Sequence, residues 1–277
     1  MKSLMTKSAA GAVLAGLSVA SFTAPASAGD LFGRHEQAGS VKDAPVEERK
    51  RLCDLSMNIG GTSDYVFRGI SQSYEDPAVQ GGVDATCGMF YAGVWASNID
   101  FVRPGNNLAG DASVEVDLYA GIKPTWGPLT FDLGVIYYWY PGGNDGGGYN
   151  YGELDYVELK GGVSGTWNKF TLGGVLFWSP DYTGETGNTI TLEGSAAYEL
   201  PAIGPVTPTI SALIGTTQFL DSGFSAGDYV YWNAGLSLGI DKFTLDFRYW
   251  DTDNSGICNG WDLCDSRFVF SAKVALP

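Results

Sequence analysis

The segment Phe243-Thr244-Leu245-Asp246-Phe247-Arg248-Tyr249 alternates strictly between apolar and polar side chains. Successive side chains of a β-strand point to opposite faces, so this period of two predicts a strand with one apolar and one polar face. The same alternation returns in 113–118 (SVEVDL), 130–135 (TFDLGV), 190–194 (ITLEG) and 268–274 (FVFSAKV). Repeated two-faced segments of this kind predict an all-β chain.

Twelve segments from residue 53 onward follow the pattern, and most of them run 9–14 residues. Strands of soluble proteins average about 5–6 residues, whereas a tilted membrane-spanning strand needs about 9–11. The segment length therefore favours a membrane barrel. The expected strands are 53–67, 77–86, 89–97, 112–122, 128–139, 154–166, 169–178, 188–199, 206–216, 228–239, 242–251 and 265–276.

The connections between these strands alternate between short and long. The short ones are 87–88, 123–127, 167–168, 200–205 and 240–241, and the long ones are 68–76, 99–111, 140–153, 179–187, 217–227 and 252–264. Transmembrane barrels have short periplasmic turns and long extracellular loops. Residues 53–277 are therefore expected to form an antiparallel up-and-down transmembrane β-barrel with both ends in the periplasm.

The N-terminus carries an export signal. Residues 1–28 combine Lys2 and Lys7, an apolar stretch at 9–20 and the cleavage pattern Ala26-Ser27-Ala28, which together predict a cleaved signal peptide. Residues 29–52 are polar and lack alternation, so we expect a flexible periplasmic segment, with a short lumen plug as the alternative. Export and a barrel together predict the outer membrane of a Gram-negative bacterium.

The composition limits the partners. The 277 residues carry a formal charge of −15, which becomes −17 after removal of 1–28, because two lysines and no acids leave. Such an acidic chain does not fit nucleic-acid binding, which depends on Lys and Arg. The expected partners are outer-membrane lipid, small polar or ionic solutes and the outer-membrane assembly machinery. No cofactor is expected.

One run of sequence is specific to a known family. The run Ser63-Asp64-Tyr65-Val66-Phe67-Arg68-Gly69-Ile70-Ser71-Gln72-Ser73, together with 76–84, 91–98, 115–121 and the pair Cys258 and Cys264, resembles the TorF family of porin-type proteins from Gram-negative bacteria. The resemblance covers residues 53–277 and implies an outer-membrane barrel of porin type. The chain departs from the usual pattern at its end, Val274-Ala275-Leu276-Pro277, where an aromatic residue is common.

If the apolar face meets lipid, the polar face of each strand lines the lumen. The acids of that face are Asp54, Asp64, Asp84, Glu115, Asp117, Asp132, Glu158, Glu193, Glu199 and Asp246, and the bases are Arg68, Lys160, Arg248, Arg267 and Lys273. An acidic water-filled pore enriches cations and excludes anions. The main prediction is therefore a channel that prefers cations; the alternative is a structural or plugged barrel whose charges pair across the lumen.

Arg68 stands at the end of the family-like run, where we expect the outer rim of the barrel. It is either a constriction charge that orients entering solutes or the partner of Asp64 or Glu115 in a structural ion pair.

The four cysteines fit an oxidising compartment. Cys258 and Cys264 flank five residues of the last long loop and are expected to form a disulfide. Cys53 and Cys87 both fall at the periplasmic rim, where a second disulfide is expected. Zinc ligation is the alternative for both pairs. The segment 251–262 has the spacing of a calcium loop, although a solvated acidic loop is favoured over a calcium site because flanking helices are absent from the pattern.

Two further classes compete with the channel. An outer-membrane enzyme is disfavoured because most such chemistry uses a histidine base, and the one histidine, His35, precedes the barrel. A secreted soluble β-protein is the other class, and the strand lengths and the parity of the loops speak against it.

Overall fold

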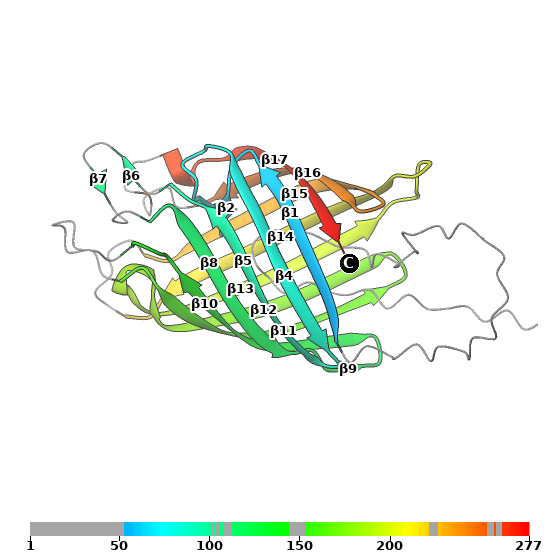
Figure 1. Cartoon of the computed structure of the whole chain (residues 1–277), viewed down its shortest axis with the longest axis horizontal. Helices are drawn as coiled ribbons and strands as arrows, with labels where there is room; N and C mark the ends of the chain where they lie inside the picture. The colour runs from blue at the N-terminus through cyan, green and yellow to red at the C-terminus, as the bar shows by residue number, and fades with distance from the viewer. Residues whose placement is uncertain are drawn as a thin grey trace, which may run out of the picture.

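The computed structural model describes residues 53–100, 102–103, 106–107, 112–143, 153–221, 227–253, 258 and 262–276. Twelve strands of this part of the chain form a closed antiparallel barrel, shown in Figure 1, in which each strand pairs with its neighbours in sequence order and the last pairs with the first. The expected fold class is confirmed.

The barrel strands are β1 (Asp54–Thr62), β4 (Ala78–Cys87), β5 (Phe90–Asn98), β8 (Val114–Ile122), β10 (Leu129–Trp139), β11 (Tyr156–Trp167), β12 (Phe170–Tyr182), β13 (Gly187–Glu199), β14 (Thr207–Phe219), β15 (Tyr229–Ile240), β16 (Phe243–Thr252) and β17 (Arg267–Leu276). The remaining elements are β2 (Val66–Phe67), β3 (Ile70–Ser71), β6 (Val102–Arg103), β7 (Asn106–Asn107), β9 (Thr125–Trp126), and the 3-10 turns η1 (Thr183–Glu185) and η3 (Asp262–Cys264).

The barrel has two different ends. The turns after β4, β8, β11, β13 and β15 meet at one end, and we call the adjoining part of the barrel the short-turn half. The longer connections lie at the other end, beside the long-loop half. Ile59 of β1 pairs with Val274 of β17, so the first and last strands lie side by side. The beginning of β1 and the end of β17 both fall at the short-turn end.

The outside of the barrel is apolar. Leu133, Leu176, Leu192 and Ile214 are between 43% and 60% exposed, and the aromatic residues Phe243 and Phe268 add to this surface. The polar residues of the same strands face inward, as the alternation predicts. None of the helices among the described residues is long and apolar enough to cross a membrane.

Several strand boundaries differ from the sequence-based expectation, among them the following two. The first strand ends at Thr62 rather than at residue 67, because the chain turns into the barrel at Ser63 and begins a separate two-stranded hairpin. The connection expected at 179–187 is only Thr183–Thr186, because β12 and β13 continue beyond the membrane-length pattern.

Both expected disulfides form, and all four cysteines are paired. Cys53 and Cys87 join the beginning of β1 to the end of β4 at the short-turn end. Cys258 and Cys264 close a small loop before β17. The zinc alternative is therefore wrong for both pairs. The expected signal peptide, the segment 29–52 with His35, and much of the loop 251–262 lie outside the described residues.

Candidate functional site

A short hairpin enters the barrel between β1 and β4. Its strands β2 and β3 are joined by Arg68 and Gly69, whose φ angles are 49° and 81°. Positive φ at both central residues defines the tight turns that connect two-residue hairpins, and glycine adopts such angles without strain. A Cβ at Gly69 would also collide with Tyr231 and Thr252 of the wall. The turn is therefore pressed against β15 and β16.

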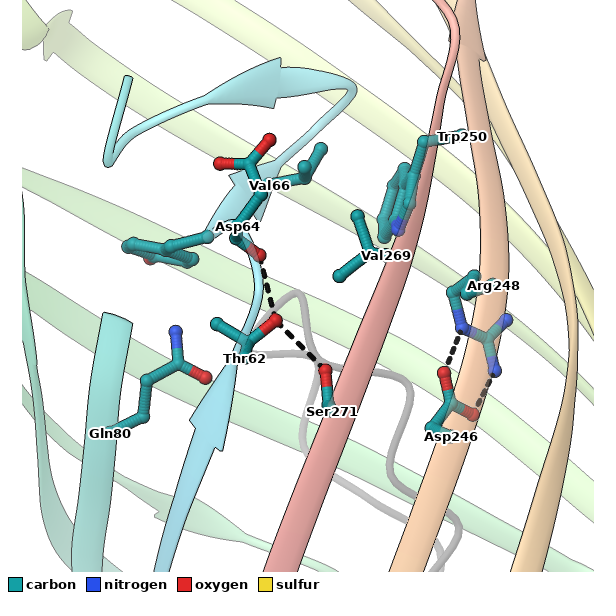
Figure 2. Close-up of a pocket in the computed structure, with 10 residues that line it drawn as sticks. Thr62, Asp64, Val66, Gln80, Asp246, Arg248, Trp250, Val269 and Ser271 are labelled. Atoms are coloured by element: carbon teal, nitrogen blue, oxygen red, sulfur yellow. Dashed lines mark hydrogen bonds and ion pairs between the residues drawn. The ribbon is translucent and has the colours of Figure 1, made fainter. Parts of the chain in front are cut away.

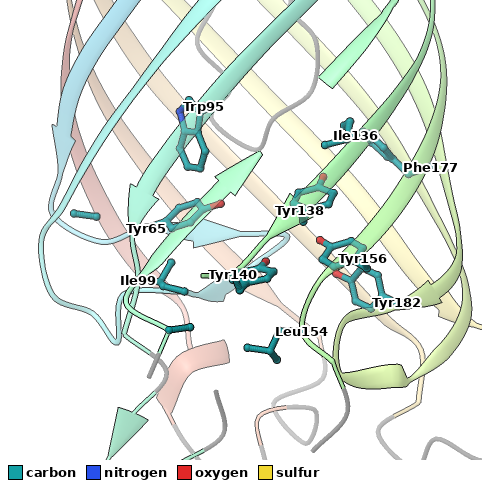
Figure 3. Packing of buried hydrophobic residues seen from close by; sticks show 12 residues of the cluster. Tyr65, Trp95, Ile99, Ile136, Tyr138, Tyr140, Leu154, Tyr156, Phe177 and Tyr182 are labelled. Carbon is teal, nitrogen blue, oxygen red and sulfur yellow. The ribbon is translucent and has the colours of Figure 1, made fainter. Parts of the chain in front are cut away.

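The hairpin fills the long-loop half by packing against opposite walls. Tyr65 joins a cluster with Trp95 of β5 and Tyr138 of β10, seen in Figure 3, and Phe67 packs against that cluster. Val66 joins a second cluster with Tyr231 of β15 and the neighbouring Trp250 and Val269. Because adjacent residues of a strand point in opposite directions, one short strand contacts both sides of the lumen.

Arg68 connects the hairpin to the far wall. The barrel order β1-β4-β5-β8-β10-β11 places β11 almost opposite β1, and Arg68 reaches across to Glu158 of β11. Two parallel hydrogen bonds join the guanidinium to the carboxylate, at 2.7 Å and 2.8 Å, and both side chains are 1% exposed. Charge-assisted bidentate pairs of this kind are among the strongest hydrogen bonds in proteins.

Aromatic rings surround the same guanidinium. Its central carbon lies 4.7 Å from the ring centre of Phe67, 4.9 Å from that of Phe177 and 5.9 Å from that of Tyr182. These separations lie within the range of cation–π attraction. Burial alone would lower the pKa of Arg68, but the attraction of Glu158 raises it above the ordinary value, so the side chain keeps its charge.

Four carboxylates lie in this region, and we call Glu115, Asp117, Glu158 and Glu193 the acidic ring. All four are buried. Tyrosine hydroxyls donate to three of them, from Tyr65 to Glu115, from Tyr138 to Glu158 and from Tyr231 to Glu193. Burial, and then the charge of Glu115, raise the pKa of Tyr65 above its usual value, so its hydroxyl stays a donor.

The hydrogen bonding of the acidic ring is incomplete. Within the part of the chain that the structure describes, neither carboxylate oxygen of Asp117 has a hydrogen-bond partner, and the Nε of Arg68 also lacks one. Buried polar atoms are normally paired, and an unpaired buried carboxylate is costly. Among the described ion pairs, the one that involves the acidic ring joins Arg68 to Glu158.

The base of the hairpin is clamped by Asp64. Its carboxylate accepts from the hydroxyls of Ser71 and Ser73 and forms an ion pair with Arg267 at 2.9 Å. Between this clamp and the wall lies a cavity of about 30 Å³, lined in part by Thr62, Asp246 and Arg248 (Figure 2). Such a volume has room for water but not for a larger solute.

The short-turn half has a different composition. Asp132 pairs with Lys160 at 2.9 Å and accepts from the hydroxyl of Tyr91, and Asp84 accepts from Tyr119. Arg248 forms an ion pair with Asp246 at 2.9 Å and also donates to wall residues. Asp84, Asp132 and Asp246 are partly exposed. Asp132 and Asp246 are therefore paired with bases of the wall.

The structure divides the expected lumen residues between the two halves. Asp64, Arg68, Glu115, Asp117, Glu158 and Glu193 lie in the hairpin or around it, whereas Asp84, Asp132 and Asp246 line the wall nearer the short turns, where Lys160 pairs with Asp132 and Arg248 pairs with Asp246. The expectation for Arg68 was wrong in both position and partner. It is buried rather than at the rim and pairs with Glu158, because the turn directs it inward, while Asp64 pairs with Arg267.

Sequence reasoning missed the aromatic part of the site. Tyr138, Phe177 and Tyr182 are buried in the lumen, and none of them was among the predicted lumen residues. Their position in the alternation was the available signal, since Tyr138 shares the parity of Asp132 and Ile136 on β10. Among the described residues, no group of three or more histidine, cysteine or acidic side chains is arranged to hold a metal ion.

Comparisons with known proteins agree on the fold. The family whose pattern matches residues 48–274 is described as "Bacterial protein of unknown function (Gcw_chp)". No curated protein matches the sequence. The structure named "KdgM porin" is similar with a TM-score of 0.51 at 8% identity, over 80% of this chain and 99% of that chain.

Two other solved structures have lower scores. The NanC porin gives a TM-score of 0.49 at 13% identity, over 81% of this chain and all of that chain. LpxR from Salmonella typhimurium gives 0.44 at 9% identity, over 80% of this chain and 99% of that chain. The similarity to the KdgM porin, at 8% identity, shows a shared barrel fold.

Proposed function

We propose, from the premise that the chain belongs to the Gcw_chp family of bacterial proteins of unknown function, that this protein is an outer-membrane channel for ions and small polar solutes, closed by the β2–β3 hairpin in the present structure. Its apolar exterior and closed hydrogen bonding suit a bilayer. The resemblance to the TorF family stays a prediction that agrees with this function.

The observation that carries the proposal is the independence of the hairpin from the barrel. β2 and β3 form a separate two-stranded sheet and do not pair with any strand of the barrel. Thr62 pairs directly with Ala78 beneath the hairpin, so the wall stays closed whether or not the hairpin is inside. Because the barrel sheet is closed without the hairpin, the hairpin can leave the lumen without breaking hydrogen bonds between the barrel strands.

We further propose that the channel prefers cations. The support for this preference is the acidic ring, where four buried carboxyl groups lie around one guanidinium. In the short-turn half, Asp132 and Asp246 are each paired with a base. A low-dielectric constriction strengthens the field of its charges, so the acidic ring would set the selectivity once the hairpin moves.

The alternative is a structural barrel that stays plugged, and the buried contacts of the hairpin favour it as the second candidate. We do not propose an enzyme, because the one histidine of the sequence, His35, lies before the barrel.

Planar-bilayer recording of two proteins separates these functions. Because Thr62 and Ala78 are register partners, residues 63–77 can be replaced by Asn-Gly, which forms a two-residue hairpin turn. We call this the plug-free variant. Heat-modifiable migration on SDS gels verifies that both proteins are folded barrels.

We expect brief conductance steps from the wild-type protein and persistent, larger steps from the plug-free variant, with reversal potentials in a salt gradient that indicate cations. A silent wild-type protein beside a conducting plug-free variant would support the plugged barrel instead. Silence of both folded proteins would overturn any channel function.

A further inference from the structure

The surroundings of Arg68 are mostly built by the barrel wall. Glu158 supplies the two hydrogen bonds, and Tyr138 donates to the same carboxylate at 3.0 Å. Phe177 and Tyr182 of β12 place their rings near the guanidinium. These wall residues form what we call the guanidinium pocket, and of the groups around Arg68 only Phe67 belongs to the hairpin.

The pocket has the two properties that recognise a planar organic cation. A carboxylate with both oxygens turned toward the guest matches the fork of a guanidinium, whereas an ammonium ion meets it as a single point. Aromatic faces attract the delocalised charge of a weakly hydrated cation. Both properties reside in β11 and β12, which pair with each other independently of the hairpin.

Asp117 and Glu193 add further carboxyl groups near the pocket. Asp117 is 0% exposed, and among the described residues neither of its oxygens has a hydrogen-bond partner. Glu193 is buried on β13, where its carboxylate accepts from Tyr231. A positive guest would favour ionisation of these carboxyl groups and an anion would oppose it, so the site selects for positive guests.

We propose that the guanidinium pocket is a binding site for guanidinium-type organic cations, and that Arg68 is its built-in occupant. A solute of this class that enters the lumen competes with Arg68 for Glu158 and thereby favours withdrawal of the hairpin. The inference deepens the proposed channel function by naming a solute class and the contact that regulates passage.

Guanidinium ion itself is the probe, and thermal unfolding in detergent micelles is the first readout, because it does not depend on conduction. Arg68→Gly removes the occupant and leaves the wall intact. Guanidinium chloride at low millimolar concentration, compared with the same concentration of NaCl, is expected to raise the unfolding temperature of this variant by about 3–5 °C at a tenfold excess over its Kd.

Three controls locate the effect. Arg68→Gly combined with Glu158→Gln is expected to lose the stabilisation, corresponding to binding at least about tenfold weaker. Lys169→Gly removes an exposed base of the short-turn end and leaves Arg68 in place, so it should show no stabilisation. The plug-free variant provides a second background without Arg68, should Arg68→Gly fail to fold, and it should respond like Arg68→Gly.

Recording provides the second readout. Guanidinium should block the current of the Arg68→Gly and plug-free proteins, and the Glu158→Gln substitution should relieve the block by at least about tenfold in concentration. Equal effects of guanidinium and sodium in every protein, or stabilisation that survives Glu158→Gln, would overturn the proposed site. If guanidinium stabilises the Arg68→Gly variant but the wild-type protein does not conduct, the binding site is supported and the proposed channel function is contradicted.

Discussion

The two halves of the lumen differ in how their charged residues are paired. In the long-loop half a hairpin crosses the barrel, and its partners come from distant strands, as in the ion pair between Arg68 and Glu158. In the short-turn half the charged residues pair within the wall, as Asp132 does with Lys160 of the adjacent strand β11. The long-loop half is therefore stabilised by contacts that cross the lumen, and the short-turn half by contacts between neighbouring residues of the wall.

This difference shows where regulation and selectivity can reside. Contacts across the lumen must break if a solute is to pass, whereas contacts around the wall remain during passage. The same residue types therefore have different consequences in the two halves. Substitutions in the long-loop half should change stability and closure, and those in the short-turn half should mainly tune the field that ions meet.

The largest effect is expected from Glu158→Ala. The substitution leaves the guanidinium of Arg68 buried without its carboxylate, and breaking a buried ion pair in this way costs about 3–5 kcal/mol. Urea titration of the folded barrel measures the loss. The double substitution Arg68→Met and Glu158→Met should recover most of it, and Lys169→Ala at an exposed pair should change stability by less than about 1 kcal/mol. An equal loss in single and double variants would contradict the cross-lumen contact.

An intermediate effect is expected from Gly69→Ala. The residue has a φ of 81°, and its new Cβ would collide with Tyr231 and Thr252, so we expect a loss of about 2–3 kcal/mol. Gly88 in the turn after β4 is the matched control, because it also has positive φ, at 66°, but nothing lies within 4 Å of its Cβ position. Gly88→Ala should lose only about 1 kcal/mol. Similar losses at both glycines would mean that the hairpin is not pressed against the wall.

The smallest effect on stability is expected from Asp84→Asn in the short-turn half. The asparagine carbonyl can still accept from Tyr119, so the loss should stay below about 1 kcal/mol. The reversal potential should nevertheless shift toward weaker cation preference, and Lys273→Gln, which removes a base from the same half, should shift it in the opposite direction. Reversal potentials that are identical in all three proteins would show that these charges do not face the ion path.

The barrel could be predicted because the pattern that specifies each strand lies within that strand's own sequence. Alternation along Phe243–Tyr249 indicates that one face of the strand meets an apolar environment and the other a polar one. The alternation of short and long connections indicates the two ends of the barrel. The alternation does not distinguish residues 63–73 from the wall. Tyr65 and Phe67 keep the odd-numbered apolar positions of β1, although Val66 between them is also apolar, because a hairpin inside the lumen has the same period of two as the wall.

The candidate site depends on contacts between residues far apart in the sequence, which the alternation of apolar and polar residues does not indicate. The inward orientation of Glu158 and Glu193 follows from parity, and both were predicted as lumen residues. The partner of Glu158 did not follow, because Arg68 lies 90 residues away and meets it only through barrel closure and the turn at Gly69. The run around Arg68 was the most specific resemblance in the sequence, and the structure places that run at the centre of the plug.

Accessibility of the two halves to a water-soluble thiol reagent tests the central claim most directly. The native cysteines are all paired, so a cysteine introduced by Val66→Cys in the hairpin, or by Ser164→Cys on β11 in the short-turn half, is a unique reactive thiol. Val66 is buried and Ser164 is partly exposed. In the folded barrel the cysteine at 66 should react at least about tenfold more slowly than the one at 164, and the two should react alike after unfolding. Equal rates in the folded protein would contradict a lumen that is filled in one half and accessible in the other.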